Sequence, residues 1–154
     1  MTACRKSSAA KGVGSLCIRE TVILRPDETV RTASRLMRDH VVGSVIVMDG
    51  GQPVGILTDR DIAIRVVSEA RDADTTPVGT VMSSPVVTVP EYAAVGEALR
   101  RMRAHRIRRL PVVNEAGTLA GILSLDDLLD LLAEELEAMA HLIRSQGEPP
   151  PKGP

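Results

Sequence analysis

Gly55-Ile56-Leu57-Thr58-Asp59-Arg60-Asp61 stands in the first half of the chain, and Gly121-Ile122-Leu123-Ser124-Leu125-Asp126-Asp127 repeats its pattern 66 residues later. In both copies a glycine and an apolar pair are followed by a hydroxyl side chain and, three residues further on, by a carboxylate. Upstream, matching pairs such as Val13-Gly14 and Val78-Gly79 lie 65 residues apart, so one residue is inserted before the second motif. A duplication of this length predicts two similar structural units.

Apolar spacing predicts the same order of elements in each unit. In the first unit the expected elements are a strand at 21–24, a helix at 30–39, a hairpin of strands 45–48 and 54–57, and a helix at 59–69. In the second they are a strand at 86–89, a helix at 95–104, a hairpin of strands 110–113 and 119–123, and a longer helix at 125–143. Short helical turns are expected at 13–17 and 78–82.

The predicted fold class is therefore α/β, of the α+β type, with two β-α-β-β-α repeats packed as a pseudo-two-fold pair. One unit of about 50 residues buries too little surface to be stable alone, so the two are expected to pack together. The repeats are placed at 12–69 and 78–143, with a linker at 70–77. The ends, residues 1–11 and the proline-rich 144–154, are expected to be disordered.

The last predicted helix is longer than its counterpart in the first repeat and carries an apolar stripe at three- and four-residue steps. Part of this stripe is expected to extend past its own unit. Packing on a second copy of the chain, in a homodimer, is the predicted use.

Composition narrows the possible functions. The 154 residues are 44% hydrophobic but include no Trp or Phe and a single Tyr, so the core is expected to be aliphatic. A net charge of −1 argues against general binding of nucleic acid by phosphate neutralisation. No apolar run approaches the ~20 residues of a membrane span, and no secretory leader is recognisable. With only two cysteines, Cys4 and Cys17, the cytoplasm is the expected location.

The motifs Thr58-x-x-Asp61 and Ser124-x-x-Asp127 can be interpreted in two ways. As a capping box, the hydroxyl accepts from a free backbone N–H at a helix start, and the carboxylate reaches back. As a ligand site, the hydroxyl binds a phosphate oxygen and the carboxylate accepts both vicinal hydroxyls of a ribose. Because the motif occurs twice at one repeat position, we expect a ligand site with which capping can coexist.

The chain resembles a tandem pair of CBS domains, the Bateman module, over about 13–143. The resemblance lies in the two motifs above, in Arg106-Ile-Arg-Arg-Leu-Pro-Val-Val113 ahead of the second one, and in Val78-Gly-Thr-Val-Met82 at the start of the second repeat. It implies a stand-alone CBS domain protein that binds AMP, ADP, ATP or a related adenosyl compound in the cleft between the repeats. In that family the Thr or Ser contacts phosphate and the Asp contacts ribose.

Carried over by position, the resemblance implies two nucleotide sites. The first would use Thr58 and Asp61, lined by Thr21, Val22, Gly43 and Ser44. The second would use Ser124 and Asp127, lined by Val86, Val87, Arg108, Arg109 and Pro111. Since a guanidinium pair favours phosphate, an anionic nucleotide is expected to prefer the site that holds Arg108 and Arg109.

The predicted function is a regulatory sensor without catalytic activity, read out by an unidentified protein partner; no catalytic motif stands out. Three alternatives remain open. The chain is a ligand-free scaffold, a nucleic-acid-associated regulator acting through Arg100–Arg109, or a redox or metal sensor using Cys17 and the histidines. The last is disfavoured because the cysteines lack metal-ligand spacing and because His40 and His105 stand where a helix end is expected. No metal site is predicted.

Overall fold

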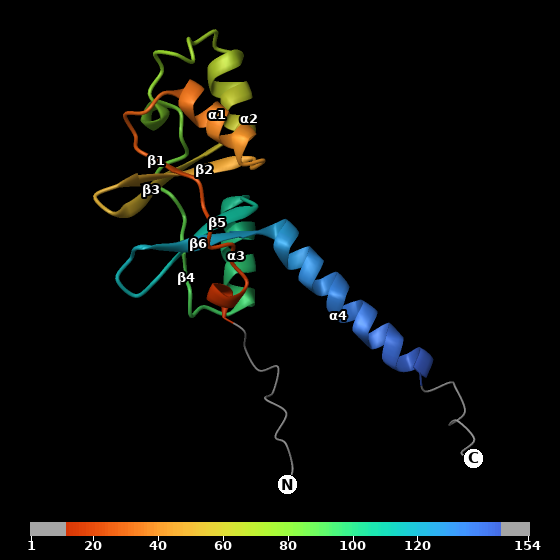
Figure 1. Cartoon of the computed structure of the whole chain (residues 1–154). Helices are drawn as coiled ribbons and strands as arrows, with labels where there is room; N and C mark the ends of the chain where they lie inside the picture. Colours follow the sequence, from red (N-terminus) through yellow and green to blue (C-terminus); the bar gives the residue numbers. More distant parts are fainter. Residues whose placement is uncertain (1–11, 146–154) are drawn as a thin grey trace, which may run out of the picture.

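The computed structural model describes residues 12–145 and contains two three-stranded sheets with their covering helices (Figure 1). The predicted disorder at 1–11 and at 146–154, like Cys4, lies outside the described residues, whereas 144 and 145, also predicted to be disordered, belong to the last helix. The sheet orders are β1-β2-β3 and β4-β5-β6, each with a parallel edge pair and an antiparallel hairpin. The predicted fold class is therefore confirmed.

The elements follow the expected order in both repeats. The first contains η1 (Val13–Ser15), β1 (Ile23–Leu24), α1 (Val30–Asp39), β2 (Ser44–Asp49), β3 (Gln52–Thr58), α2 (Asp59–Ile62) and η2 (Ala63–Val67). The second contains η3 (Val78–Thr80), β4 (Val89–Pro90), α3 (Val95–His105), β5 (Arg109–Val113), β6 (Leu119–Ser124) and α4 (Leu125–Ser145). The hairpins and first helices match the prediction to within one or two residues, because their apolar periodicity is local.

Four elements differ from the prediction. The strands expected at 21–24 and 86–89 are reduced to β1 and β4, two residues each, because only two residues of each pair with the central strand of its sheet. The helix expected at 59–69 is a single α-turn followed by the π-helix η2, in which the amide of Ser68 bonds the carbonyl of Ala63 five residues back. Helix α4 continues to Ser145, two residues beyond its expected end.

The opening segment of each repeat packs on the other repeat. Gly14 of η1 donates to the carbonyl of Glu91, and Gly79 of η3 donates to the carbonyl of Pro26. Further along, Ile18 forms an antiparallel bridge with Ile122 of β6, and Ser83 forms the equivalent bridge with Ile56 of β3. In Figure 1 these appear as two traces, one red to orange and one green, each of which runs from one sheet to the other. The two repeats are thus joined by a reciprocal exchange of chain.

The hydrophobic cores carry the same exchange. The core of the first sheet contains Val78 and Val81 from the second opening segment, and the core of the second sheet contains Val13 from the first. Val13 and Val78 have no exposed surface. Burial of aliphatic side chains across the repeat boundary is favourable in proportion to the apolar area removed from water. Each core is therefore completed by the other half of the chain.

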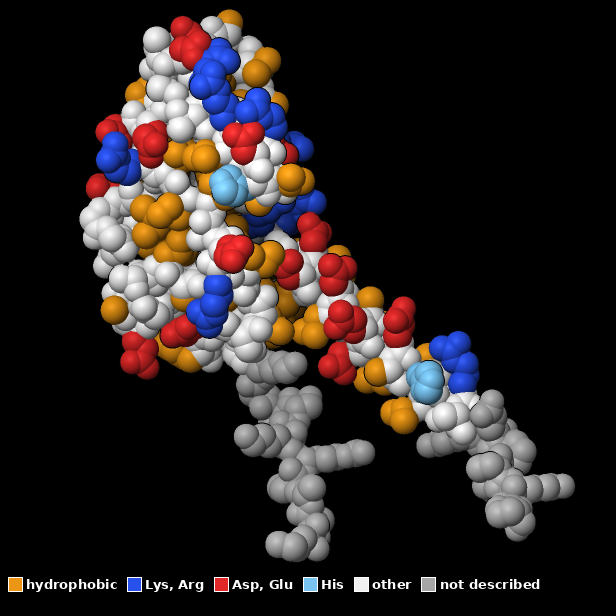
Figure 2. All heavy atoms as spheres, in the orientation of Figure 1, with side chains coloured by type: hydrophobic (Ala, Val, Ile, Leu, Met, Phe, Trp, Pro, Cys, Tyr) orange, Lys and Arg blue, Asp and Glu red, His pale blue; other side chains and the backbone are white. Residues whose placement is uncertain are grey.

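Helix α4 leaves the body and projects away from it (Figure 1). Leu128 is its one buried residue and Leu131 is partly buried, whereas the other leucines, the methionine and the isoleucine beyond Leu128 are more than half exposed, from Leu129 and Leu132 at 54% to Ile143 at 74%. Figure 2 shows acidic side chains alternating with this apolar surface along the helix. A monomer leaves this stripe in water.

Candidate functional site

Two cavities lie between the repeats, and each contains one copy of the motif. The Asp61 cavity has a volume of about 440 Å³ and is lined by Thr58 and Asp61 together with Val86, Val87, Arg108 and Arg109. The Asp127 cavity, of about 180 Å³, is lined by Ser124 and Asp127 together with Thr21, Val22, Gly43 and Ser44. Each motif therefore lies beside lining residues that belong to the other repeat.

The grouping predicted from the sequence is wrong in this respect. Thr21, Val22, Gly43 and Ser44 were predicted beside Asp61 and lie beside Asp127, whereas Val86, Val87 and Arg108 were predicted beside Asp127 and lie beside Asp61. The cause is the exchange of opening segments, which brings the chain before each first strand onto the opposite hairpin. Arg109 lines both cavities. Pro111 lies buried in β5 opposite Ile122 and lines neither cavity.

Both motifs form capping boxes. The backbone amide and the hydroxyl of Thr58 donate to Oδ2 of Asp61 at 3.0 and 2.7 Å, and the amide of Asp61 donates to Oγ1 of Thr58 at 3.1 Å. The same three bonds join Ser124 and Asp127, at 2.9, 2.6 and 3.1 Å. One oxygen of each carboxylate is thus held by its own backbone, while the carboxylate still borders a cavity. Capping and an adjacent open space coexist.

The second oxygens of the two carboxylates have different neighbours. Oδ1 of Asp61 lies 3.3 Å from Nη2 of Arg65, whose guanidinium also donates to the carbonyl of Val81 at 2.8 Å and to the hydroxyl of Ser83 at 3.2 Å. The repeat equivalent of Arg65 is Leu131, which has no charge. Among residues 12–145, no side chain forms a hydrogen bond or ion pair with Oδ1 of Asp127. The sequence contains no signal for the Arg65 contacts, because a lone arginine after a helix start is commonly solvated.

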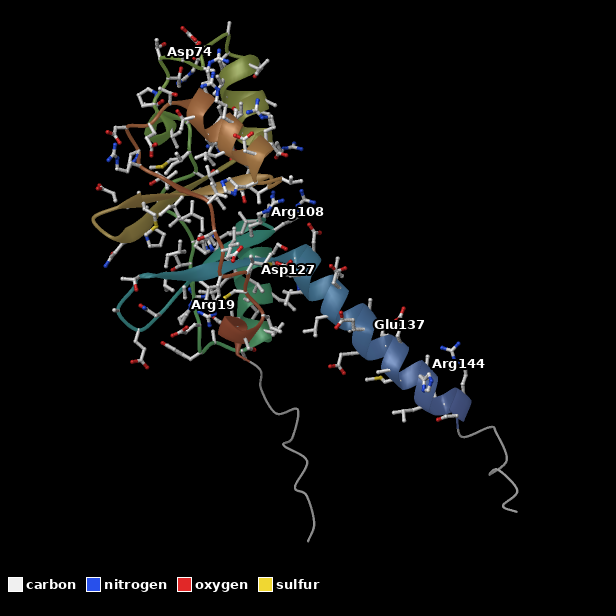
Figure 3. The ribbon with its side chains drawn as sticks, in the orientation of Figure 1. Arg19, Asp74, Arg108, Asp127, Glu137 and Arg144 are labelled. Atoms are coloured by element: carbon white, nitrogen blue, oxygen red, sulfur yellow. The ribbon has the colours of Figure 1, made fainter. Side chains whose placement is uncertain are left out.

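Charge also separates the two cavities. The Asp61 cavity is lined by Arg60, Arg106, Arg108 and Arg109, by His105, and by the carboxylates of Asp59 and Asp61. In the Asp127 cavity the ionisable residues are Glu20, Arg109 and Asp127. Arg108 and Asp127 both lie on the side of the body from which α4 departs (Figure 3). The Asp61 cavity is therefore suited to anions, and the Asp127 cavity is not.

The remaining candidates have structural partners. Arg100 and Arg101 both bind Glu97, and Arg101 also donates to the carbonyl of Thr88. These contacts, with that of Arg101 first, lower the pKa of the Glu97 carboxyl. Part of the arginine stretch is thus neutralised within the chain. His40 caps the end of α1, as its sequence position predicts, whereas His105 ends α3 and reaches the Asp61 cavity.

Cys17 is half-buried against Gly121, and burial raises the pKa of its thiol. Within residues 12–145, no three His, Cys, Asp or Glu side chains come together as metal ligands. A third hollow, wide and shallow, with a volume of about 810 Å³, lies at the hairpin turns beside Arg19, Ile23 and Met48. It contains neither motif. No helix in the described part of the chain is long and apolar enough to cross a membrane.

Comparison with known proteins agrees with this architecture. The family model of the CBS domain matches residues 13–68 and again residues 78–134. The CBS domain-containing protein YhcV of Bacillus subtilis is 39% identical over 109 residues, which cover 71% of this chain and 76% of YhcV. The uncharacterized protein MK0525 of Methanopyrus kandleri is 38% identical over 120 residues, and the match spans 77% of this chain and 61% of that protein.

A solved structure extends the likeness to three dimensions. The CBS domain protein PAE2072 from Pyrobaculum aerophilum, in complex with AMP, superposes with a TM-score of 0.70 at 30% identity. The superposition covers 79% of this chain and 98% of that one. The arrangement of paired repeats is thus shared with an experimentally determined protein.

Proposed function

The chain belongs to the CBS domain family, as a regulatory module with two copies of the domain, and we propose that it senses an adenine nucleotide or a related adenosyl compound in the cavities between the repeats. AMP, ADP, ATP and other adenosyl compounds share the adenine and ribose that the motif is suited to bind. The main observation in support is that each motif carboxylate borders a cavity lined by residues of both repeats. A ligand there would contact both halves of the chain at once.

The proposal assigns ribose hydroxyls to Asp61 and Asp127, and phosphate to Thr58 and Ser124. Val86 and Val87 in one cavity, and Thr21, Val22, Gly43 and Ser44 in the other, would lie against the base. Arg108 and Arg109 line the Asp61 cavity, so an anionic nucleotide is proposed to bind there more tightly. The complex of PAE2072 with AMP, from a protein 30% identical to this chain, supports the ligand class.

Signalling is proposed to follow from a ligand that binds one arrangement of the repeats more tightly than another. The free energy available for the change equals that difference in affinity. The exchanged opening segments offer the route, since a shift of Ser83 moves a strand bridge with Ile56 in the other repeat. A protein partner would detect the change; catalysis has no part in the proposal, and the cytoplasm stays the predicted location.

A homodimer through α4 forms part of the proposal. Leu129, Leu132, Leu136, Met139 and Ile143 follow one another at alternating three- and four-residue steps, and all are more than half exposed. This is the spacing of a seam between two paired helices. A second copy of α4 presents the same seam, so a dimer would bury both.

The test is thermal unfolding of the full chain with millimolar ATP, ADP, AMP or S-adenosylmethionine. A ligand that binds the native state alone raises the midpoint, by about 2.7 kcal/mol of stability at a hundred times its Kd. Asp61→Ala and Asp127→Ala should reduce the shift, each for the ligand bound in its own cavity. If no adenosyl compound raises the midpoint, the chain is an interaction scaffold with capped helices, and the sensing proposal is wrong.

A further inference from the structure

The asymmetry between the two cavities has a consequence for the class of ligand each can hold. A phosphorylated ligand entering the Asp61 cavity meets four arginines against two carboxylates. The same ligand entering the Asp127 cavity meets one arginine against the carboxylates of Glu20 and Asp127. Like charges in a partly desolvated site repel strongly, because the effective dielectric constant there is lower than in water. Phosphate is thus favoured in one cavity and opposed in the other.

The single arginine of the Asp127 cavity, Arg109, also lines the Asp61 cavity. Nη2 of Arg109 and Oδ2 of Asp59 lie 3.3 and 3.4 Å from the same point, the position that a β-carbon on Gly43 would occupy. The guanidinium and this carboxylate flank Gly43, and among the described residues they form no ion pair with each other. The Asp127 cavity thus has no arginine of its own to attract an anion.

The second carboxylate oxygens, Oδ1 of Asp61 and of Asp127, favour the same division between ligands with and without phosphate. Oδ1 of Asp61 faces Arg65, so a ribose hydroxyl that donates to this oxygen must share it with a guanidinium. Oδ1 of Asp127 has Leu131 at the corresponding position and no such competitor among the described residues. A ligand that depends on its diol, with no phosphate to add binding energy, is served better by Asp127.

Size agrees with charge. Cavities that hold small organic ligands commonly measure about 300–1,000 Å³. The Asp61 cavity, at about 440 Å³, lies within that range, whereas the Asp127 cavity, at about 180 Å³, lies below it. The smaller cavity has less room than the larger one for a phosphate chain.

We propose that the two cavities divide ligands by charge: the Asp127 cavity takes a nucleoside that carries no phosphate, and the Asp61 cavity takes a phosphorylated nucleotide. The residue pair Arg65 and Leu131 separates the two specificities. This inference rests on the proposed function, and it adds that one chain binds two different adenosyl compounds at the same time.

Titration calorimetry with adenosine and with ATP on the full chain tests the division. We expect each probe to bind with a stoichiometry of one, and adenosine to bind equally well when the protein is already saturated with ATP. Arg108→Ala should weaken ATP roughly tenfold, the loss of one charge-assisted contact, and leave adenosine unchanged. Asp127→Asn should weaken adenosine by a similar factor and leave ATP unchanged; Asp61→Asn is its matched control.

Two variants that swap the residue types at positions 65 and 131 test the role of Arg65 and Leu131 without changing either capping box. Arg65→Leu should open the Asp61 cavity to adenosine and raise the adenosine stoichiometry from one towards two. Leu131→Arg should weaken adenosine at the Asp127 cavity. Because both leave the hydrogen bonds of the motifs intact, they remain informative if an Asp→Asn variant unfolds.

The outcomes separate this inference from the proposed function. If the unmodified chain binds neither probe, both are overturned. If it binds both probes but ATP displaces adenosine one for one, or if one variant abolishes both, the division by charge is overturned and the sensing function stands. Simultaneous binding with separate losses supports the division.

Discussion

Nη2 of Arg109 lies 3.3 Å from the point where a β-carbon on Gly43 would stand, so a side chain of the second repeat rests on the bare backbone of the first. The two residues occupy neighbouring repeat positions, since Gly43 corresponds to Arg108. The missing side chain at Gly43 gives Arg109 its place between the two cavities.

Replacing Gly43 by valine is expected to displace this guanidinium and to weaken ATP binding roughly tenfold, through loss of a charge-assisted contact. Gly43→Ala is the control, because one methyl group at 3.3 Å is relieved by a small movement of a flexible arginine. Calorimetry measures both. Equal ATP affinity in Gly43→Val and the unmodified chain would contradict the prediction.

The capping boxes are expected to stabilise the ligand-free protein. Thr58→Ala and Ser124→Ala each remove a hydroxyl that accepts from a backbone amide and donates to a carboxylate, at a cost of about 1 kcal/mol in the free energy of unfolding. Thr58→Ser keeps the hydroxyl and should cost little. Urea unfolding without nucleotide measures these values, and an unchanged Thr58→Ala protein would show that the cap contributes nothing.

Two equivalent glycines are expected to differ in their tolerance of alanine. A β-carbon on Gly121 would stand 2.7 Å from the backbone oxygen of Ile18, which is fixed by the strand bridge, whereas one on Gly55 would meet mainly the side chain of Met82. Gly121→Ala should therefore cost about 1–3 kcal/mol, as overpacking does, and Gly55→Ala less.

The measurement is urea unfolding of both single variants and of a double-mutant cycle between Gly55→Ala and Met82→Ala. Removing the Met82 side chain should recover part of the cost of Gly55→Ala, since the two changes share one contact. Equal costs for the two glycines would disprove the distinction between a fixed backbone and a movable side chain.

Val41 is expected to be a destabilising residue at its position. Its φ is 54°, in the left-handed region, and its side chain is 91% exposed, so it gains little from packing. Val41→Gly should raise the free energy of unfolding by about 1 kcal/mol, because an L-residue is penalised there and glycine is not. Val42→Gly, at the next position with no left-handed φ, should lower it. A decrease for Val41→Gly would refute the idea.

A charge in the apolar stripe of α4 is expected to separate a dimer. Leu136 lies in the stripe and is 56% exposed, and Leu136→Glu would place two carboxylates across the seam. Ala138→Glu adds the same charge to an exposed position outside it. Light scattering should find Leu136→Glu monomeric and Ala138→Glu dimeric. If both variants are dimeric, the prediction that the dimer forms through the apolar stripe of α4 is wrong.

The sequence predicted the elements well wherever local periodicity decides them. The helix at 30–39 has the bounds of α1, and both hairpins have the expected turns. The fold class and the two motifs followed from the duplication itself. The helix and hairpin bounds depend on residues that are close together in the chain, and the duplication is a pattern repeated within it, so a single sequence contains both kinds of information.

The sequence alone could not show whether each hairpin pairs with the opening segment of its own repeat or with that of the other repeat. Because Ile56 and Ile122 are equivalent, and Ser83 and Ile18 are equivalent, the same residues satisfy pairing within a repeat and pairing across repeats. Most of the predicted lining residues were therefore assigned to the wrong motif; Arg109, which lines both cavities, is the exception. The contacts of Arg65 were missed for a related reason: they depend on a π-helix and on residues 16 to 18 positions away.

Because each opening segment packs on the other repeat, neither repeat is expected to fold without the other. A chain with a single repeat would lack the valines that the other repeat supplies to its core. Its hairpin would also lose the strand bridge to the opening segment of the other repeat. Such a half could regain a fold by borrowing those pieces from a second identical molecule. A peptide-bond cut within 70–77 should likewise leave two fragments that reassemble when mixed, which makes this chain a natural starting point for a split reporter.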